Sequence, residues 1–562
     1  MPCSGLLAQD LEQSDTATIR TITVKVRNIF SEKEESNLIY RTANNLKINT
    51  RQKVILTELL FKEGDPYSKF IIAESLRNLR NIRFLRDPKI TPTFNGKFVD
   101  IEVNVQDTWT LIPQFSFSSG DGENKFAAGL AESNLAGTGK RLEALFSDDN
   151  DRQTVETVWE DPRLLNTKNK LLAAYLASSD GEQYIFSLGK PFRSLVEERS
   201  WITKFNDNDF VGKLFENSDE KFIFRQKQTN LGAAITFSDG DPEKSRKRYT
   251  VGYNYDDTRF SQANQNDYLD VGLDPDLVSN DPQFLAENRR FSGPTFTFQS
   301  IEPEYISMAY IDRFERVSDY NLGNTYSLTS QFAPEALGSR EDTFLFGAQT
   351  SKGWLFNNSS FLRSELRGSS RAAGDDLDNS LLAAEIKWFN VLGSLFVGDH
   401  FLGKHTLAAN FTIDYSDDLD QDRQFRAGGD NALRGYEAKT FNGDKRLVLN
   451  LEDRFHLVDN VFDLVSLGGA FFIDVGGASY DQYSDILQDQ LYSNVGFGLR
   501  LGIPKSSGER TIRIDIAFPL RDGPDGSGEF EPRIIFSGGQ LFSSRLRSEP
   551  SETETVAVGL DR

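Results

Sequence analysis

Three charged residues between positions 417 and 476 have the types and spacing that could form a buried ionic cluster. Arg434 lies in a long polar loop, residues 417–445, and the segments that follow carry Glu452 and Asp474. A guanidinium fork matches carboxylates, and an unpaired buried charge would cost about 3–5 kcal/mol. We therefore expect the loop arginine to pair with both acids. The alternative is that Arg434 stays on an ordinary surface loop.

The two acids lie on segments whose alternation of apolar and polar residues predicts β-strands. In residues 447–455 one face carries three leucines, and the other carries Asn450, Glu452 and Arg454. In residues 471–476 the same parity turns Phe472 and Asp474 to that second side. If the strands line a barrel, both carboxylates point into its lumen, where they either meet Arg434 or simply line the wall.

Alternating segments of this kind fill the chain from Thr110 onwards, separated by clusters of Gly, Asp, Asn and Ser. The clearest are residues 495–503 and 512–518, in which one face is wholly apolar. Runs of about nine residues suit a tilted strand that crosses the hydrocarbon of a membrane. Roughly 430 residues at about 27 per strand and connection predict about 16 strands, an even number as in bacterial barrels. We expect a transmembrane antiparallel β-barrel over residues 110–542.

Residues 19–109 show a different pattern, which predicts one small α/β domain. A strand near 22–26 precedes two helical segments near 50–61 and 68–79, and two strands near 82–90 and 99–105 follow. The order is β-α-α-β-β over about 90 residues, a length that can just bury its own core. We interpret residues 1–18 as a flexible segment left from a leader, and residues 543–562 as a polar tail.

Composition excludes several classes of protein. Hydrophobic residues make up 38% of the 562 positions and no apolar run of about 18 residues occurs, so the chain does not resemble a helical membrane protein. A net charge of −21 argues against nucleic acid as a partner. The 44 Phe, 17 Tyr and 43 Gly suit the aromatic girdles and turns of a membrane barrel, although a soluble β-sandwich could share them.

No pattern in the chain indicates catalysis. The sequence lacks a nucleophile elbow, a phosphate loop and a Cys/His metal cluster. Its histidines are His400, His405 and His456, and its single cysteine is Cys3. We therefore expect no enzymatic activity, no cofactor and no metal ion.

Together, these motifs resemble one family. Leu433-Arg434-Gly435-Tyr436, Glu452 and Phe472-Ile473-Asp474-Val475-Gly476 resemble the loop and strand motifs of BamA- and TamA-like barrels, and residues 134–139 and 161–164 also look similar. That superfamily contains outer-membrane protein assembly factors and two-partner secretion transporters. The resemblance implies a POTRA domain before a 16-stranded barrel in the bacterial outer membrane, with the N-terminal domain in the periplasm. It assigns a luminal loop lock to Arg434, Gly435, Tyr436, Glu452, Phe472 and Asp474.

A second implication concerns a lateral seam between the first and last strands, through which clients of this family are expected to pass. Pro113, on the predicted first strand, lacks an amide donor and suits a sheet edge. The predicted last strand, residues 533–542, contains Gly538 and Gly539 and ends at the aromatic Phe542. The alternative is that Pro113, Gly538 and Gly539 only serve ordinary turns and the narrowing of the barrel at these positions.

The resemblance implies a protein that inserts β-barrel proteins into the outer membrane or translocates polypeptides across it. Its partners would be unfolded polypeptide clients, outer-membrane lipid and periplasmic accessory proteins or chaperones. One alternative is a two-partner secretion transporter for a dedicated exoprotein, although residues 1–18 are too short and polar for the plug helix of such transporters. A passive porin ranks last, because it would need neither the small domain nor the lock.

Overall fold

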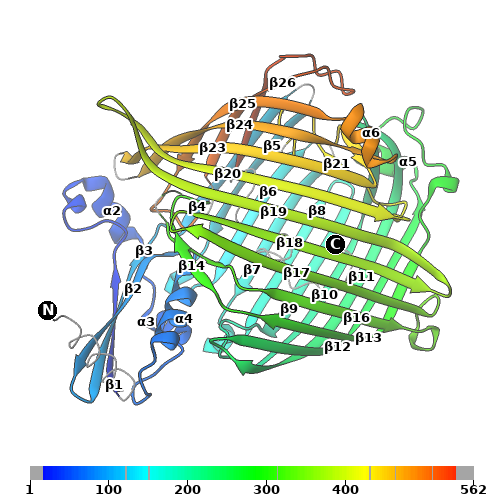
Figure 1. Ribbon diagram of the computed structural model, residues 1–562. Coiled ribbons are helices and arrows are strands. Elements are labelled where there is room, and N and C mark those ends of the chain that lie inside the picture. Colours follow the sequence, from blue (N-terminus) through cyan, green and yellow to red (C-terminus); the bar gives the residue numbers. More distant parts are fainter. Residues whose placement is uncertain are drawn as a thin grey trace.

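The computed structural model describes residues 17–538, except 121–122, 150–151, 313, 315, 430–431, 462–463 and 509–510. A small α/β domain near the N-terminus lies beside one end of a large closed β-sheet (Figure 1). Most of the expected leader segment and all of the expected tail, residues 543–562, lie outside the described residues.

The small domain packs helices on a three-stranded sheet of order β1-β3-β2. Its elements are β1 (Thr18–Arg27), α2 (Leu38–Leu46), α3 (Gln52–Glu58), α4 (Lys69–Arg80), β2 (Leu85–Asn95) and β3 (Phe98–Asp107). β3 buries every second residue, and its core side chains are Val99, Ile101, Val103 and Val105. Ser68 caps α4 by accepting a hydrogen bond from the amide of Ile71, as its position before the helix predicted.

Helix α2 is an addition to the predicted β-α-α-β-β order. Its Leu38 is 71% exposed, and its buried aromatic residue is Tyr40. The Tyr40 ring stacks on Phe30 at 4.4 Å between centroids, in a cluster separate from the main core of the domain. The apolar residues of α2 follow a helical spacing, but the predicted order placed its first helix at residues 50–61 and did not include α2. No helix among the described residues is long and apolar enough to cross a membrane.

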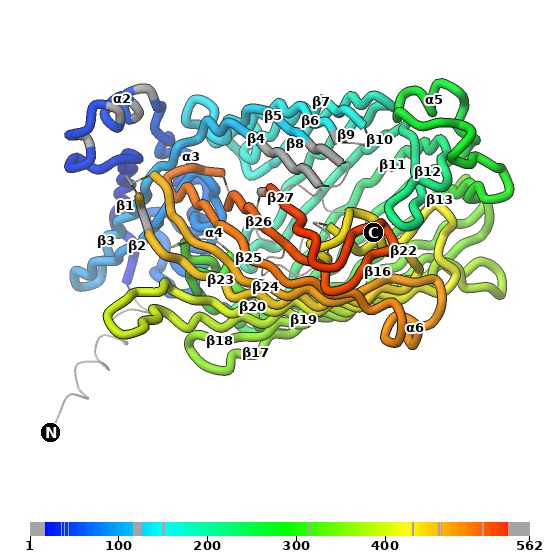
Figure 2. The backbone as a smooth tube through the Cα atoms, turned by 90° about the horizontal axis from the view of Figure 1, so that it is seen from above, coloured from blue at the N-terminus to red at the C-terminus, as the bar shows by residue number. Residues whose placement is uncertain are grey.

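Twenty antiparallel strands close into a barrel within the described residues (Figures 1 and 2). They are β4 (Leu111–Gly120), β5 (Glu123–Glu132), β6 (Arg141–Asp149), β7 (Arg152–Asp161), β8 (Lys170–Ser178), β9 (Gly181–Lys190), β10 (Arg199–Glu216), β11 (Asp219–Asp241), β12 (Ser245–Gln262), β13 (Arg289–Ile301), β16 (Thr325–Ala333), β17 (Thr343–Asn357), β18 (Ser360–Ala373), β19 (Asp376–Val397), β20 (His400–Asp417), β23 (Lys445–Val461), β24 (Val465–Ser479), β25 (Tyr492–Gly502), β26 (Ile512–Pro519) and β27 (Arg533–Gly538).

The barrel is confirmed, but the expected number of about 16 strands was too low. Residues 111–190 alone hold six strands of nine or ten residues. The estimate assumed one repeat length for the whole chain, whereas β10, β11 and β19 have 18, 23 and 22 residues. Strand number depends on this local variation in length, which an average hides.

Alternation along the strands separates an outer from an inner face. On β23 to β25 the outward residues Leu451, Ile473 and Phe497 are 39%, 44% and 48% exposed. Their inward neighbours Glu452 and Asp474 are buried. The barrel thus has an apolar outer surface and a polar interior, as the sequence predicted.

The two ends of the barrel differ. We call the end beside the small domain the proximal end, because the chain enters β4 there, and the other the distal end. The distal loops include α5 (Gln265–Asp270), α6 (Tyr483–Gln488) and a long loop, residues 418–444, with β21 (Phe425–Ala427) and β22 (Phe441–Gly443). The proximal end has an insertion between β13 and β16, residues 302–324, with β14 (Tyr305–Met308) and β15 (Ser318–Asn321).

Candidate functional site

The distal loop 418–444 enters the barrel and buries its central motif. Leu433, Arg434 and Tyr436 have no exposed surface. The backbone turns sharply at Gly428 and Gly429, whose φ angles of 133° and 53° suit glycine. The amide of Gly429 then donates to the carbonyl oxygen of Tyr436, which closes the turn around the motif.

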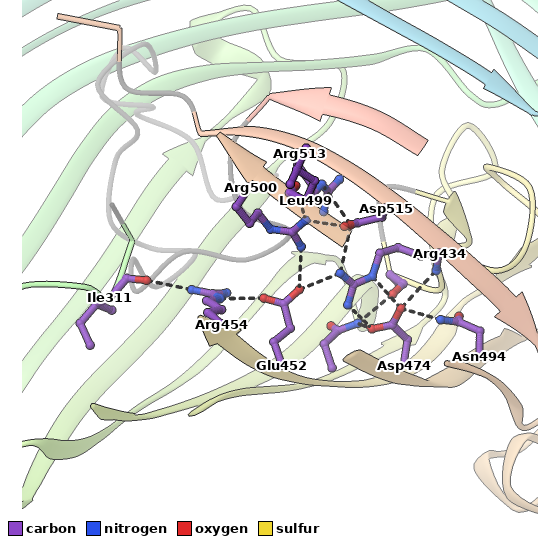
Figure 3. Close-up of polar contacts among 12 residues, drawn as sticks. Ile311, Arg434, Glu452, Arg454, Asp474, Asn494, Leu499, Arg500, Arg513 and Asp515 are labelled. Atoms are coloured by element: carbon purple, nitrogen blue, oxygen red, sulfur yellow. Dashed lines mark hydrogen bonds and ion pairs between the residues drawn. The ribbon is translucent and has the colours of Figure 1, made fainter. Parts of the chain in front are cut away.

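The guanidinium of Arg434 makes a two-pronged contact with Asp474 and a further contact with Glu452 (Figure 3). Its Nε and Nη2 donate to the two carboxylate oxygens of Asp474 at 2.9 and 2.8 Å. Its Nη1 donates to Oε1 of Glu452 at 2.7 Å. The Arg434 Cζ also lies 3.4 Å from the ring centroid of Phe472. The expected ionic contact therefore forms, and Phe472 covers one face of it.

A third carboxylate, that of Asp515 on β26, completes the cluster, and the sequence did not single it out. Its Oδ2 lies 3.3 Å from Nη1 of Arg434. The partner position of Asp515 on β25 is Gly498, where any side chain would overlap the carboxylate. Alternation in residues 512–518 had placed Asp515 on the polar face, but only the register across β25 brings it to Arg434.

Three more arginines surround the acids and are also buried. Nε of Arg454 donates to Oε2 of Glu452 at 2.7 Å, Arg500 donates to Asp515, and Nε of Arg513 lies 3.4 Å from Asp515. Asn450 and Asn494 donate to the two oxygens of Asp474, each at 2.9 Å. Four arginines thus face three carboxylates in one network, so each buried charge has opposite charges beside it. We call these seven ionic residues the luminal cluster.

Gly435 and Tyr436 allow the loop to lie close to the wall. A Cβ at Gly435 would lie 2.6 Å from the Cβ of Asn494, so a side chain there would push the loop away. The Tyr436 hydroxyl donates to the carbonyl oxygens of Ser493 and Arg521, at 3.1 Å each. Burial of the ring raises the pKa of Tyr436 to about 12, so the hydroxyl keeps its proton.

The seam candidates lie apart from the cluster. Pro113 is on β4 and Gly538 is the last residue of β27, and these two strands are neighbours where the ring closes (Figure 2). Gly539 and Phe542 lie outside the described residues.

The small domain docks on proximal turns formed by the two other noted stretches, residues 134–139 and 161–164. Asn134 donates to the Thr50 hydroxyl at 2.8 Å, and the amide of Arg51 donates to the carbonyl oxygen of Gly137 at 2.9 Å. Glu58, at the end of α3, accepts hydrogen bonds from Arg163 and Arg193. These motifs therefore position the small domain.

The histidines do not come together. The Nδ1 of His405 lies 2.9 Å from Asp453, and Nδ1 of His456 lies 3.2 Å from the carbonyl oxygen of Lys404. Within the described part of the chain, no group of three or more His, Cys, Asp or Glu residues could hold a metal ion.

Comparison with known proteins gives a consistent result. Residues 134–542 match the Omp85 superfamily domain. Over 115 residues the chain is 37% identical to a protein of Treponema pallidum (strain Nichols) described as an outer membrane protein assembly factor, a match that covers 20% of this chain and 13% of that relative. The chain thus spans only a small part of this relative's length.

Three solved structures resemble the chain over 93% of its length at low sequence identity. BamA from Haemophilus ducreyi lacking POTRA domains 1–3 has 13% identity, 84% of its chain covered and a TM-score of 0.37. CdiB from Acinetobacter baumannii has 13% identity, 74% covered and a TM-score of 0.46. CdiB from Escherichia coli has 10% identity, 76% of its chain covered and a TM-score of 0.46. Because the family match covers most of the chain, this protein belongs to the Omp85 superfamily of outer-membrane assembly and secretion proteins, with its barrel in the bacterial outer membrane and its N-terminal domain in the periplasm.

Proposed function

We propose that this protein inserts β-barrel proteins into the outer membrane without any covalent step. The observation that carries the proposal is the luminal cluster, which ties one distal loop to four successive strands. Glu452, Asp474, Arg500 and Asp515 come from β23, β24, β25 and β26. The loop therefore braces the wall up to β26, and β27 is the described C-terminal strand that the brace does not reach.

The unbraced strand adjoins the first strand of the barrel. β27 lies next to β4 where the ring closes, and β4 contains Pro113, which has no amide hydrogen to donate to a neighbouring strand. Because the luminal cluster does not hold this pair of strands, we propose that the barrel opens between β27 and β4.

An opened seam would expose unpaired backbone donors and acceptors on both strands. Such an edge can pair with an incoming strand, which gives a route for a client to fold against the barrel wall. In this proposal the luminal cluster keeps β23–β26 rigid while the seam moves. The clients are unfolded outer-membrane polypeptides, outer-membrane lipid receives them, and periplasmic accessory proteins or chaperones deliver them to the N-terminal domain.

Quantitative proteomics of outer membranes and culture medium tests this function in cells depleted of the protein. The depleted cells are complemented with the wild type, with Arg434→Ala, or with Arg340→Ala as a matched control. Arg340 is also a distal-loop arginine, but it is exposed and its guanidinium donates to a carbonyl oxygen, that of Asn288. We expect many barrel proteins to fall together on depletion, and only Arg434→Ala to fail to restore them.

A different outcome would favour the second candidate function. If the membrane proteome holds steady while one large exoprotein disappears from the medium, the protein is a dedicated secretion transporter. If Arg434→Ala restores the membrane proteome as fully as Arg340→Ala does, the luminal cluster has no part in the function, and the observation that carries the proposal is lost.

A further inference from the structure

The insertion between β13 and β16, residues 302–324, contacts both the N-terminal domain and the interior of the barrel. We call it the proximal hairpin. Its strands β14 and β15 pair with each other and not with the barrel sheet. In Figure 1, β14 lies beside α4 at the proximal mouth. The proposed function does not account for this insertion.

On one side, the hairpin holds the end of α4. The guanidinium of Arg316 donates to three carbonyl oxygens, those of Arg80, Ile82 and Arg83, at 2.9, 3.1 and 3.2 Å. The last carbonyls of a helix lack partners within it and attract cations, so this contact is favourable for both parts. In return, Nη1 of Arg80 donates to Asp319 of the hairpin at 2.6 Å.

On the other side, the hairpin fills the proximal part of the lumen. Ile311 and Tyr320 pack in one cluster with Phe361 and Phe389, which have no exposed surface. The ring of Phe314 meets that of His456 on β23, with 4.6 Å between centroids. These contacts bury apolar surface against inward-facing residues of the barrel. A shift of the hairpin would therefore displace the side chains of the barrel wall.

One guanidinium joins the hairpin to the luminal cluster. Nη1 of Arg454 donates to the carbonyl oxygen of Ile311 at 3.0 Å, while its Nε donates to Glu452. Glu452 in turn accepts from Arg434 through its other oxygen. Figure 3 shows these groups in sequence, from Ile311 through Arg454 and Glu452 to Arg434. Because Arg454 is 1% exposed, water cannot readily take the place of the Ile311 carbonyl.

We propose that the proximal hairpin couples the position of the N-terminal domain to the luminal cluster, which holds the distal loop through Arg434 and is called the lock below. With the domain docked, Ile311 holds Arg454, and Arg454 orients Glu452 toward Arg434. When the domain moves, its contact with Arg316 displaces the hairpin, and Arg454 loses its hydrogen bond to Ile311. Arg454 then no longer orients Glu452, and the contact between Glu452 and Arg434 weakens. That a client moves the domain rests on the proposed function, whereas the coupling itself is a property of the protein alone.

Hydrogen–deuterium exchange on the purified full chain in lipid nanodiscs tests the coupling without any client. Thermodynamic coupling is reciprocal: if the position of the domain changes the stability of the lock, a change in the lock must also change the stability of the docked domain. We therefore expect Arg434→Ala to speed the exchange of α4 amides by roughly 5-fold or more, within the usual range of coupling between sites. In an Arg316→Ala background the same substitution should have no further effect on α4.

Glu58→Gln is the matched background, because Glu58 anchors the domain through Arg163 and Arg193 and not through the hairpin. There the effect of Arg434→Ala on α4 should persist. Protection of the long strands β10–β12 checks that each variant is folded, and Glu452→Gln replaces Arg434→Ala if that variant does not fold. The proposal is overturned if Arg434→Ala leaves the exchange rate of the α4 amides unchanged in the wild-type background. It is also overturned if Arg434→Ala speeds this exchange as much in the Arg316→Ala background as in the wild type.

Discussion

The distal lock and the proximal docking surface are built from the same residue types but in different surroundings. In the lock, the side chains of Arg434, Glu452 and Asp474 are 0% exposed. The docking contacts are less completely buried: Arg80 and Asp319 are 25% and 10% exposed, and Arg163 and Glu58 are 7% and 6% exposed. Water can replace a partly exposed partner but not a buried one, so the first contact is costly to break and the second can be remade. The lock is therefore the contact that costs more to break, and the docking surface is the contact that separates and re-forms more easily.

The largest effect should come from removing the lock arginine. Arg434→Ala removes the buried charge that faces Asp474 and leaves this carboxylate with the hydrogen bonds from Asn450 and Asn494, so we expect the free energy of unfolding to fall by about 3–5 kcal/mol. Denaturant unfolding of the purified barrel in detergent measures the loss. Arg340→Ala should leave the midpoint unchanged. Equal midpoints for the two variants would mean that the buried network is not a brace.

A smaller loss should follow from adding one methyl group beside the lock. Gly435→Ala places a Cβ against Asn494 and should cost about 1–3 kcal/mol, the usual price of overpacking. The same unfolding assay applies, with Gly528→Ala as control. Gly528 is also in a distal loop, but a Cβ there meets only the flexible side chain of Glu531. If both variants unfold alike, the loop has more freedom than its contacts indicate.

The proximal docking surface should respond without loss of the barrel. Glu58→Gln removes the charge that Arg163 and Arg193 share and should weaken docking by about 1–3 kcal/mol. Limited proteolysis near residues 108–110 should then become faster, while unfolding of the barrel stays the same. Glu102→Gln is the control, because its partner Lys25 lies on the exposed face of the small sheet. A lowered barrel midpoint in Glu58→Gln would show that this docking contact, which does not involve the proximal hairpin, also stabilises the barrel.

The smallest expected effect is that of acidification on the docking of the small domain. Partial burial raises the pKa of Glu34, but hydrogen bonds from Lys505 and Ser31 outweigh it, so the pKa lies below its ordinary value of 4.5. The contribution of this carboxylate to docking is therefore full above that value and is lost as the pH falls through the lowered pKa. Proteolysis near residues 108–110 should quicken in acid, and Glu34→Gln should remove part of that dependence. An identical acid response in the variant would assign it to other groups.

Local alternation let the sequence determine much of the lock. Because side chains alternate between the two faces of a strand, the parity of residues 447–455 and 471–476 was enough to turn Glu452 and Asp474 inward. These strands follow one another in the chain, so their acids could be placed together. The small domain was predicted for a similar reason, except for α2, which the predicted order did not contain.

Only the tertiary structure decided the rest. Asp515 joins the cluster through the register of two further strands, and the carbonyl of Ile311 reaches Arg454 across 143 positions of the chain. The closing of 20 strands rather than about 16 depends on the length of every strand and turn. Alternation is a property of neighbouring residues and can be read locally, whereas register and closure are summed over the whole ring, so no single segment of the sequence contains them.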